Sequence, residues 1–138
     1  MISGAIPALE KAESKARELG ARRVIRLRVA GAFHSPLMKS AEEKLRKELE
    51  KISFSTPNVP VVANATGKYV RTPEEARETL AVQITSSVLW KDSLRLLWND
   101  GVRTFMEIGP GSVLSGLVRR TLPEAEAFSI NTPENLKK

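Results

Sequence analysis

The alternation of helical and extended patterns is the feature that most constrains the fold of this chain of 138 residues. In some segments apolar residues recur every three or four positions, and in others they alternate or form short uninterrupted runs. Helices are expected at about residues 9–19, 40–52, 73–83, 91–101 and 113–118, and strands at residues 23–29, 61–65, 104–108 and 127–130. Strands that alternate with helices predict an α/β domain with a mostly parallel sheet.

One helix start is marked with particular clarity. Thr72 is a good N-cap residue, Pro73 fits the first helical position, and the acidic Glu74 and Glu75 follow in the first turn. Glu75 also stands at the position of a capping box, where its carboxylate can bind a free backbone N–H. A helix is therefore predicted to begin at this point.

The composition is that of a globular protein, with 41% hydrophobic and 28% charged residues. No apolar run approaches the roughly 18 residues that span a bilayer, and the chain turns charged soon after its first residues, unlike a signal peptide. Cysteine is absent from the sequence, which excludes disulfides, thiolate metal sites and a cysteine nucleophile. We expect a cytoplasmic protein with no membrane partner.

The net charge of +6 suggests an acidic partner, although lysines and arginines are interleaved with glutamates along the expected helices. Aromatic residues make up only 5% of the chain, too few for a surface on which nucleic-acid bases stack. Nucleic acid is not an expected partner. An acidic carrier protein or a phosphate-bearing ligand fits this charge better.

The only histidine of the chain, His34, lies in the loop formed by residues 31–38, between an expected strand and an expected helix. Imidazole exchanges protons near neutral pH, and α/β folds place their chemistry on loops at strand ends. A lone histidine in a glycine-containing loop is also often incidental. One histidine with scattered carboxylates offers no metal-ligand spacing, so no metal site is expected.

For the other polar residues, a structural role is an alternative to a catalytic or binding role. Ser35 adjoins His34, but adjacent side chains on an extended segment diverge, and Ser112 lacks the glycines of a nucleophile elbow. Residues 107–112 could cradle an anion on backbone amides, or simply form a tight turn from strand to helix. Gln83 and Asn64 adjoin apolar segments and would by default be exposed or capping residues.

Taken together, five segments resemble one family. Residues 2–4, 31–38, 61–67, 83–90 and 107–117 match, in order and spacing, the malonyl-CoA:acyl carrier protein transacylases and the acyltransferase domains of polyketide and fatty acid synthases. The resemblance extends over essentially the whole chain. It implies an enzyme in which a serine is acylated by malonyl-CoA and passes the acyl group to the phosphopantetheine thiol of acyl carrier protein.

The resemblance also implies roles for individual residues. His34 matches the catalytic histidine, the general base for the serine and then for the incoming thiol. Gln83 matches the residue whose backbone carbonyl orients that histidine, leaving Nε2 free to take a proton. Phe33 is expected to narrow the acyl pocket in favour of malonyl over methylmalonyl groups, and Asn64 is a second substrate-binding candidate. No cofactor is implied besides the substrates.

In fold, the resemblance implies the C-terminal part of a hydrolase-like parallel-sheet core over residues 31–138, preceded by a remnant of a ferredoxin-like subdomain over residues 1–30. The family's nucleophilic serine, oxyanion loop and carboxylate-binding arginine all precede the matched segments. We therefore expect a fragment of the transacylase that is inactive alone and exposes sheet edges. It would pair with a complementing N-terminal half, self-associate or rearrange; the alternative is a non-catalytic module that binds carrier protein or CoA, or associates with itself.

Overall fold

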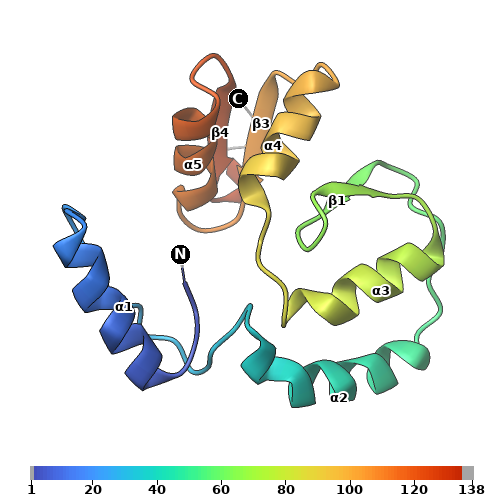
Figure 1. Cartoon of the computed structure of the whole chain (residues 1–138). Helices are drawn as coiled ribbons and strands as arrows, with labels where there is room; N and C mark the ends of the chain where they lie inside the picture. The colour runs from blue at the N-terminus through green and yellow to red at the C-terminus, as the bar shows by residue number, and fades with distance from the viewer. Residues whose placement is uncertain (1, 135–138) are drawn as a thin grey trace. The chain divides into compact units, whose positions relative to one another are not determined.

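The computed structural model describes residues 2–134 and forms two compact units, one ending at Val88 and the other beginning at Leu89. Helices and short strands occur in both units (Figure 1). The α/β class predicted from the sequence is thus confirmed. Among residues 2–134, no helix is both long enough and apolar enough to cross a membrane.

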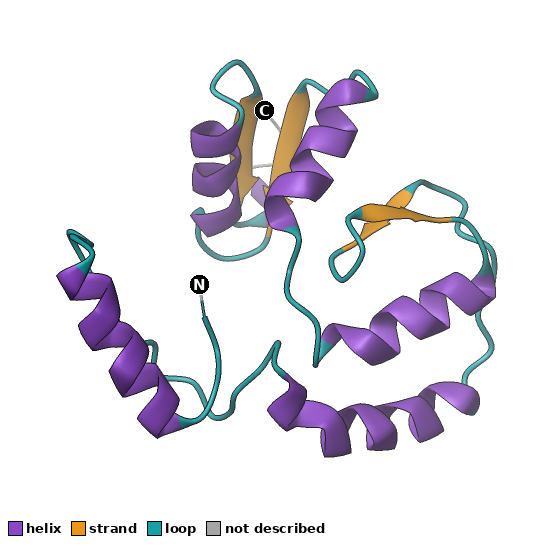
Figure 2. Ribbon diagram, in the orientation of Figure 1, coloured by secondary structure: helices purple, strands orange, loops and turns teal. Residues whose placement is uncertain are grey.

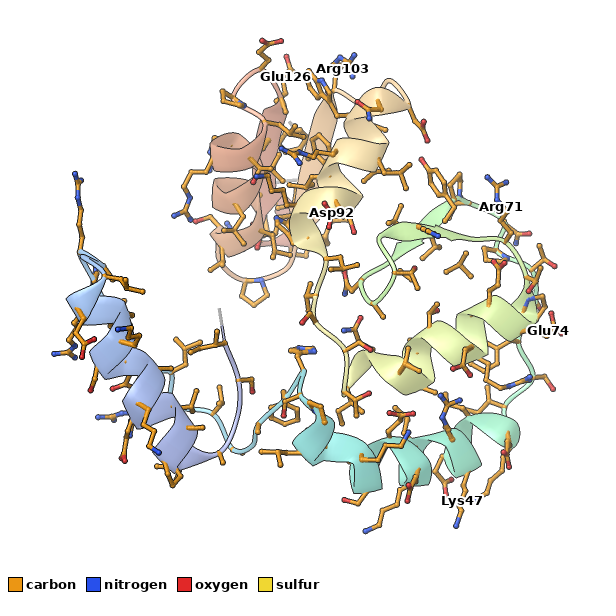
Figure 3. The ribbon with its side chains drawn as sticks, in the orientation of Figure 1. Lys47, Arg71, Glu74, Asp92, Arg103 and Glu126 are labelled. Carbon is orange, nitrogen blue, oxygen red and sulfur yellow. The ribbon has the colours of Figure 1, made fainter. Side chains whose placement is uncertain are left out.

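The first unit is organised around a pair of helices. Its elements are, in order, α1 (Ile6–Glu18), the 3-10 helix η1 (Pro36–Met38), α2 (Lys39–Glu50), β1 (Val61–Ala63), β2 (Lys68–Val70) and α3 (Pro73–Gln83). Helices α2 and α3 pack side by side (Figure 1). The Arg77 guanidinium of α3 donates to the carbonyls of Leu49 and Ile52, each at 3.3 Å, at the end of α2. Side chains on the outer face of α2, such as Lys47, point away from α3 (Figure 3).

Helix α3 begins as its sequence predicts. Pro73 is its first residue, and the Thr72 hydroxyl accepts a hydrogen bond from the Glu75 backbone N–H at 3.1 Å. The Glu75 carboxylate in turn accepts from the Arg71 N–H at 2.7 Å, one residue before the N-cap. The first bond satisfies a backbone donor that the first turn of a helix leaves without a partner, and the second ties the residue before the N-cap to that turn.

The second unit contains α4 (Trp90–Asn99), β3 (Thr104–Ile108), α5 (Val113–Thr121) and β4 (Glu126–Ile130). Strands β3 and β4 are parallel, with Phe105 opposite Ala127 (Figure 2). Both helices pack against this sheet around a small apolar core. The core consists of Leu94, Val118, Leu122 and Ala125, with Trp90, Trp98, Phe105 and Ala127 packed against it.

The prediction of one mostly parallel sheet is wrong for residues 2–134, whose strands form two sheets of two strands each. Strands β1 and β2 are antiparallel, with Val61 opposite Val70. They are joined by the turn of residues 64–67, which is long enough for a hairpin and far too short for a parallel crossover. Only β3 and β4, which are connected through α5, form a parallel pair.

Residues 23–29 are extended without strand pairing, so the predicted strand is wrong as a sheet element. A strand needs a neighbour for its ladder of hydrogen bonds, and this segment pairs with none in the described chain. Instead it lies along α1, where the Arg26 guanidinium contacts the Glu13 carboxylate at 2.9 Å. The apolar side chains of Ile25, Leu27 and Val29 are exposed along this segment, as are the arginines between them.

Candidate functional site

His34 stands out first by its backbone. Its φ of 63° is the one positive value among the non-glycine residues of the described chain. The left-handed region is costly for residues with a Cβ, and such strain concentrates at functional sites. The conformation is fixed by a hydrogen bond of 2.9 Å from the His34 N–H to the Ile84 carbonyl, just beyond α3.

The imidazole of His34 is held by the same segment. Its Nδ1 atom lies 3.0 Å from the Gln83 carbonyl oxygen and 3.0 Å from the Ser86 carbonyl oxygen. Carbonyl oxygens only accept, so Nδ1 carries the hydrogen and donates it to the pair. The Gln83 side-chain nitrogen is farther from Nδ1, at 3.4 Å, and two donors cannot bond to each other. In the neutral ring, Nε2 is therefore left with its lone pair.

The end of α3 also provides a polar electrostatic setting. Gln83 is the last residue of α3, and the final carbonyls of a helix have no partners within it. These carbonyls carry the partial negative charge of the helix dipole, which favours a positive charge placed beside them. The site therefore suits an imidazole that donates through Nδ1 and presents Nε2 as its acceptor nitrogen.

Ser35 is committed to the local structure. Its hydroxyl donates to the Ala32 carbonyl at 2.6 Å and accepts from the Leu37 N–H at 3.3 Å, which caps η1. Only 5% of Ser35 is exposed. A hydroxyl used in this way is a poor candidate for a nucleophile.

The two substrate-binding candidates lie in different places. Phe33 is partly exposed and folds back over Gly31, where a Cβ atom would lie 3.7 Å from its ring. Asn64 is exposed in the turn between β1 and β2. The structure thus brings His34 and Gln83 together, with Phe33 next to His34 in the same loop, while Asn64 takes no part in the hydrogen bonds that hold His34.

The turn of residues 107–112 has a structural function. The Glu107 carboxylate accepts hydrogen bonds from the N–H groups of Leu114 at 3.1 Å and Ser115 at 2.8 Å, at the start of α5. The bond from Ser115 is the main cause that lowers the pKa of Glu107. These two amides could have held an anion from solution, but the chain's own carboxylate occupies them. Ser112, the N-cap residue, makes no side-chain capping bond.

Sequence reasoning missed three residues around His34. The Ser86 carbonyl is a second acceptor for Nδ1. Glu42 is buried and binds the hydroxyl of Thr85, in the same turn as the carbonyls that hold the ring. Its spacing from Lys39 and Arg46 on α2 signals a helical ion-pair cluster, although such clusters are usually exposed.

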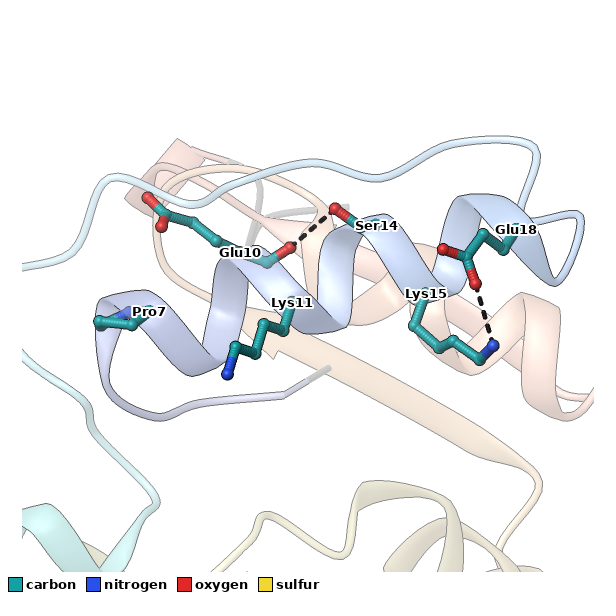
Figure 4. Close-up of a pocket in the computed structure, with 6 residues that line it drawn as sticks. All are labelled: Pro7, Glu10, Lys11, Ser14, Lys15 and Glu18. Atoms are coloured by element: carbon teal, nitrogen blue, oxygen red, sulfur yellow. Dashed lines mark hydrogen bonds and ion pairs between the residues drawn. The ribbon is translucent and has the colours of Figure 1, made fainter.

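A hollow of about 480 Å³ lies along α1, away from these residues (Figure 4). Its lining comes from one helix only: Pro7, Glu10, Lys11, Ser14, Lys15 and Glu18. Two of these lining residues, Lys15 and Glu18, form an ion pair of 2.9 Å along the helix. Ligand sites enclose most of a ligand's surface with convergent groups, and a single helix face cannot do so. In the described part of the chain, no group of three metal-ligating side chains is present either.

Comparison with known proteins gives the relationships of the chain. No protein-family model matches it. The malonyl CoA-acyl carrier protein transacylase of Bacillus subtilis (strain 168) is 39% identical over 137 residues, which make up 99% of this chain and 43% of that protein. The transacylase of the same name from Escherichia coli (strain K12) is 37% identical over 133 residues, 96% of this chain and 43% of that protein.

Solved structures of transacylases are also similar to this chain. The malonyl-CoA:acyl carrier protein transacylase of Xanthomonas oryzae pv. oryzae matches with a TM-score of 0.92 at 30% identity, over 97% of this chain and 43% of that one. A type II polyketide synthase acyl-carrier protein in complex with its malonyl-transacylase matches with a TM-score of 0.93 at 35% identity, again over 97% and 43%. The chain thus spans less than half the length of the proteins it matches.

By fold, the chain corresponds to part of these α/β proteins. It is homologous, over nearly its whole length, to malonyl CoA-acyl carrier protein transacylases, and the resemblance seen in the sequence is confirmed.

Proposed function

We propose that this chain supplies the histidine half of a malonyl-CoA:acyl carrier protein transacylase active site, for fatty acid biosynthesis in the cytoplasm. One observation carries the proposal: Nδ1 of His34 is held by the Gln83 and Ser86 carbonyls, each at 3.0 Å, which leaves Nε2 as the basic nitrogen. A general base needs a lone pair that points in a fixed direction and is not already bonded to a hydrogen.

In the proposed reaction, Nε2 of His34 takes the proton of a serine hydroxyl while the serine oxygen attacks the thioester carbon of malonyl-CoA. The C–S bond breaks, and the CoA sulfur leaves with that proton as a free thiol. His34 then takes the proton of the phosphopantetheine thiol, and the thiol sulfur attacks the malonyl-serine ester. The ester C–O bond breaks, and the serine oxygen leaves with the proton from His34. The Gln83 carbonyl orients the ring throughout, and the end of α3 stabilises the imidazolium in each half.

The serine and the arginine that binds the malonyl carboxylate would come from a complementing N-terminal half. This division makes residues 31–138 the C-terminal part of a hydrolase-like core and residues 1–30 the remnant of a ferredoxin-like subdomain. The exposed apolar positions Ile25, Leu27 and Val29 support a partner segment at that edge, because unpaired extended backbone readily adds a strand. A second copy of the chain is the alternative partner.

Acyl carrier protein is the proposed acyl acceptor, and malonyl-CoA the donor. The names of the relatives and the solved complex of an acyl-carrier protein with its malonyl-transacylase support this assignment. The net charge of +6 suits an acidic partner. In this scheme Phe33 restricts the acyl pocket and Asn64 contributes to substrate binding.

The test is malonyl transfer from malonyl-CoA to acyl carrier protein by three preparations. The chain alone is expected to be inactive. Activity is expected when the unmatched part of the Bacillus subtilis transacylase is supplied separately, and also in a full-length hybrid, in which this chain replaces the matched segment of 137 residues in that protein. In the hybrid, His34→Ala should lower kcat by about 10²–10⁴-fold, the usual contribution of a general base.

The exposed Glu43→Gln variant is the matched control and should retain the activity of the hybrid, because Glu43 lies on α2 and does not contact His34. Transfer by the chain alone would overturn the assignment of a half-site. A hybrid that binds carrier protein but transfers nothing would instead favour the non-catalytic binding module.

A further inference from the structure

Glu42 on α2 is a buried carboxylate with a full set of partners. Only 3% of the residue is exposed. Its Oε1 accepts from Lys39 Nζ at 2.9 Å and Arg46 Nε at 3.0 Å, and its Oε2 accepts from the Thr85 hydroxyl at 2.7 Å. A buried charge persists only when it is paired and hydrogen-bonded, so these contacts account for its burial.

The same cluster joins α2 to α3. The Arg46 guanidinium binds both oxygens of Glu78 on α3, at 2.6 and 2.8 Å. Such two-pronged bonds fix orientation as well as distance. Glu42 and Arg46 therefore clamp α2 to α3 at two places, at Glu78 within the helix and at Thr85 just beyond its end.

Thr85 lies in the turn that holds His34. The carbonyls of Gln83, Ile84 and Ser86 in this turn all accept hydrogen bonds from His34. The backbone N–H of Thr85 donates locally, to the Val82 carbonyl at 3.2 Å. The single hydroxyl hydrogen has two acceptors within reach, and Glu42 Oε2 at 2.7 Å is closer than the Val82 carbonyl at 3.1 Å. The bond to Glu42 thus anchors the turn to a different helix.

We infer that Glu42 is a positioning residue, which acts through the Thr85 hydroxyl to fix the turn of residues 83–86 and so to hold His34 in its Nδ1–H tautomer. The use of that tautomer in catalysis rests on the function proposed above. The presence of the tautomer does not, so the positioning role and the proposed function can be tested separately. The low pKa of Glu42, at about 2, chiefly due to the hydrogen bond from Thr85, keeps the carboxylate charged at every pH of interest.

The experiment uses the fact that the chain has one histidine. With ¹⁵N-labelled histidine, the two ring nitrogens give one pair of NMR signals, and their shifts report which nitrogen carries the hydrogen. At about pH 8.5, where an ordinary imidazole is neutral, the wild-type chain should show the Nδ1–H form. Thr85→Val, which keeps the shape but removes the hydroxyl, should shift the signals toward a mixture of tautomers, and Glu42→Ala should do the same.

Two variants serve as controls. Thr85→Ser restores the hydroxyl and should restore the wild-type signals, and Glu43→Gln on the exposed side of α2 should leave them unchanged. If Thr85→Val keeps the wild-type tautomer, the inference is overturned. If Glu42→Ala loses its helical circular dichroism, the result for Thr85→Val decides alone. Unfolding of the Thr85→Val variant would also overturn the inference, because the bond would then stabilise the whole unit and not the turn specifically.

In the full-length hybrid, Thr85→Val should lower kcat by on the order of tenfold to a hundredfold with little change in KM, as expected for a misplaced base. Thr85→Ser should recover that loss. A hybrid without activity, combined with a tautomer that still responds to Thr85→Val, would refute the proposed function and leave the positioning role intact.

Discussion

The Nδ1 atom of His34 lies 3.0 Å from the backbone carbonyl of Gln83, a residue 49 positions further along the chain. This contact joins a strained loop to the end of α3, so the direction of the imidazole depends on how that loop packs against the turn after the helix. A backbone carbonyl fixes the tautomer as a carboxylate would, but adds no full negative charge to the site.

The backbone at His34 should prefer glycine once the side chain is removed. Its φ of 63° costs a residue with a Cβ roughly 1–2 kcal/mol. His34→Ala loses the imidazole bonds and keeps this cost, whereas His34→Gly loses the same bonds and relieves it. In urea unfolding followed by circular dichroism, we expect His34→Gly to be the more stable of the two by about 1 kcal/mol. An equal or lower stability of the glycine variant would show that the loop relaxes when its side chain is cut back.

Phe33 should influence which acyl group the full-length hybrid accepts. Phe33 directly precedes His34 in the loop and its ring lies over Gly31, so Phe33→Ser would remove bulk from that side of the loop. A difference of one methyl group in an apolar pocket is worth roughly 10–200-fold in specificity. We expect the kcat/KM ratio of methylmalonyl-CoA to malonyl-CoA to rise by about tenfold or more. Leu37→Ala, in the same loop, is the control, and an unchanged ratio in Phe33→Ser would remove Phe33 from the acyl pocket.

The small core of the second unit should be sensitive to lost volume. Leu94 is 2% exposed and lies at its centre, so Leu94→Ala should destabilise this unit by about 2–5 kcal/mol. Both tryptophans of the chain, Trp90 and Trp98, pack against the core, so their fluorescence follows its unfolding. Leu114→Ala, at a residue that is 44% exposed, removes the same atoms and should cost far less. Equal losses would mean that the apolar core is not where the structure has it.

Local chemistry predicted the helices well, because each carries its own signals. Thr72 and Pro73 mark the start of α3 within a few residues, and the structure uses both of them there. Strands fared less well, since a strand exists only with its partner. The extended residues 23–29 have none in the described chain, whereas Lys68–Val70, with a charged start after a turn, pairs with Val61–Ala63 as β2.

The site was predictable only through family resemblance. No spacing pattern in the sequence predicts that His34 forms a hydrogen bond to a carbonyl 49 residues away. Glu42 was missed for a different reason: glutamates in a helix rich in lysine are usually solvated. Its burial depends on a hydrogen bond from the Thr85 hydroxyl, which lies just beyond the end of α3. This contact is set by tertiary packing, which the local sequence does not reveal.

Glu42 should contribute to stability in a way that depends on pH. Its carboxylate accepts hydrogen bonds from Thr85, Lys39 and Arg46, which lower its pKa to about 2 in the folded chain, compared with about 4.3 for an ordinary glutamate. A lowered folded pKa stabilises the fold fully above the unfolded value and loses this effect as the pH falls toward the folded one. The contribution is therefore complete near pH 6 and declines below roughly pH 4.5.

Glu42→Gln removes this titration, so its deficit in unfolding free energy relative to wild type should be largest near pH 6 and should shrink by about pH 3.5. Urea unfolding monitored by circular dichroism at several pH values measures it. Glu78, which shares Arg46 and also has a lowered pKa, titrates in both proteins, so the difference between the two proteins reports chiefly on Glu42. Glu43→Gln should parallel wild type at every pH. A deficit that stays constant from pH 6 to 3.5 would mean that the folded carboxylate titrates like a free one, and the clamp between α2 and the turn after α3 would then lack its charged centre.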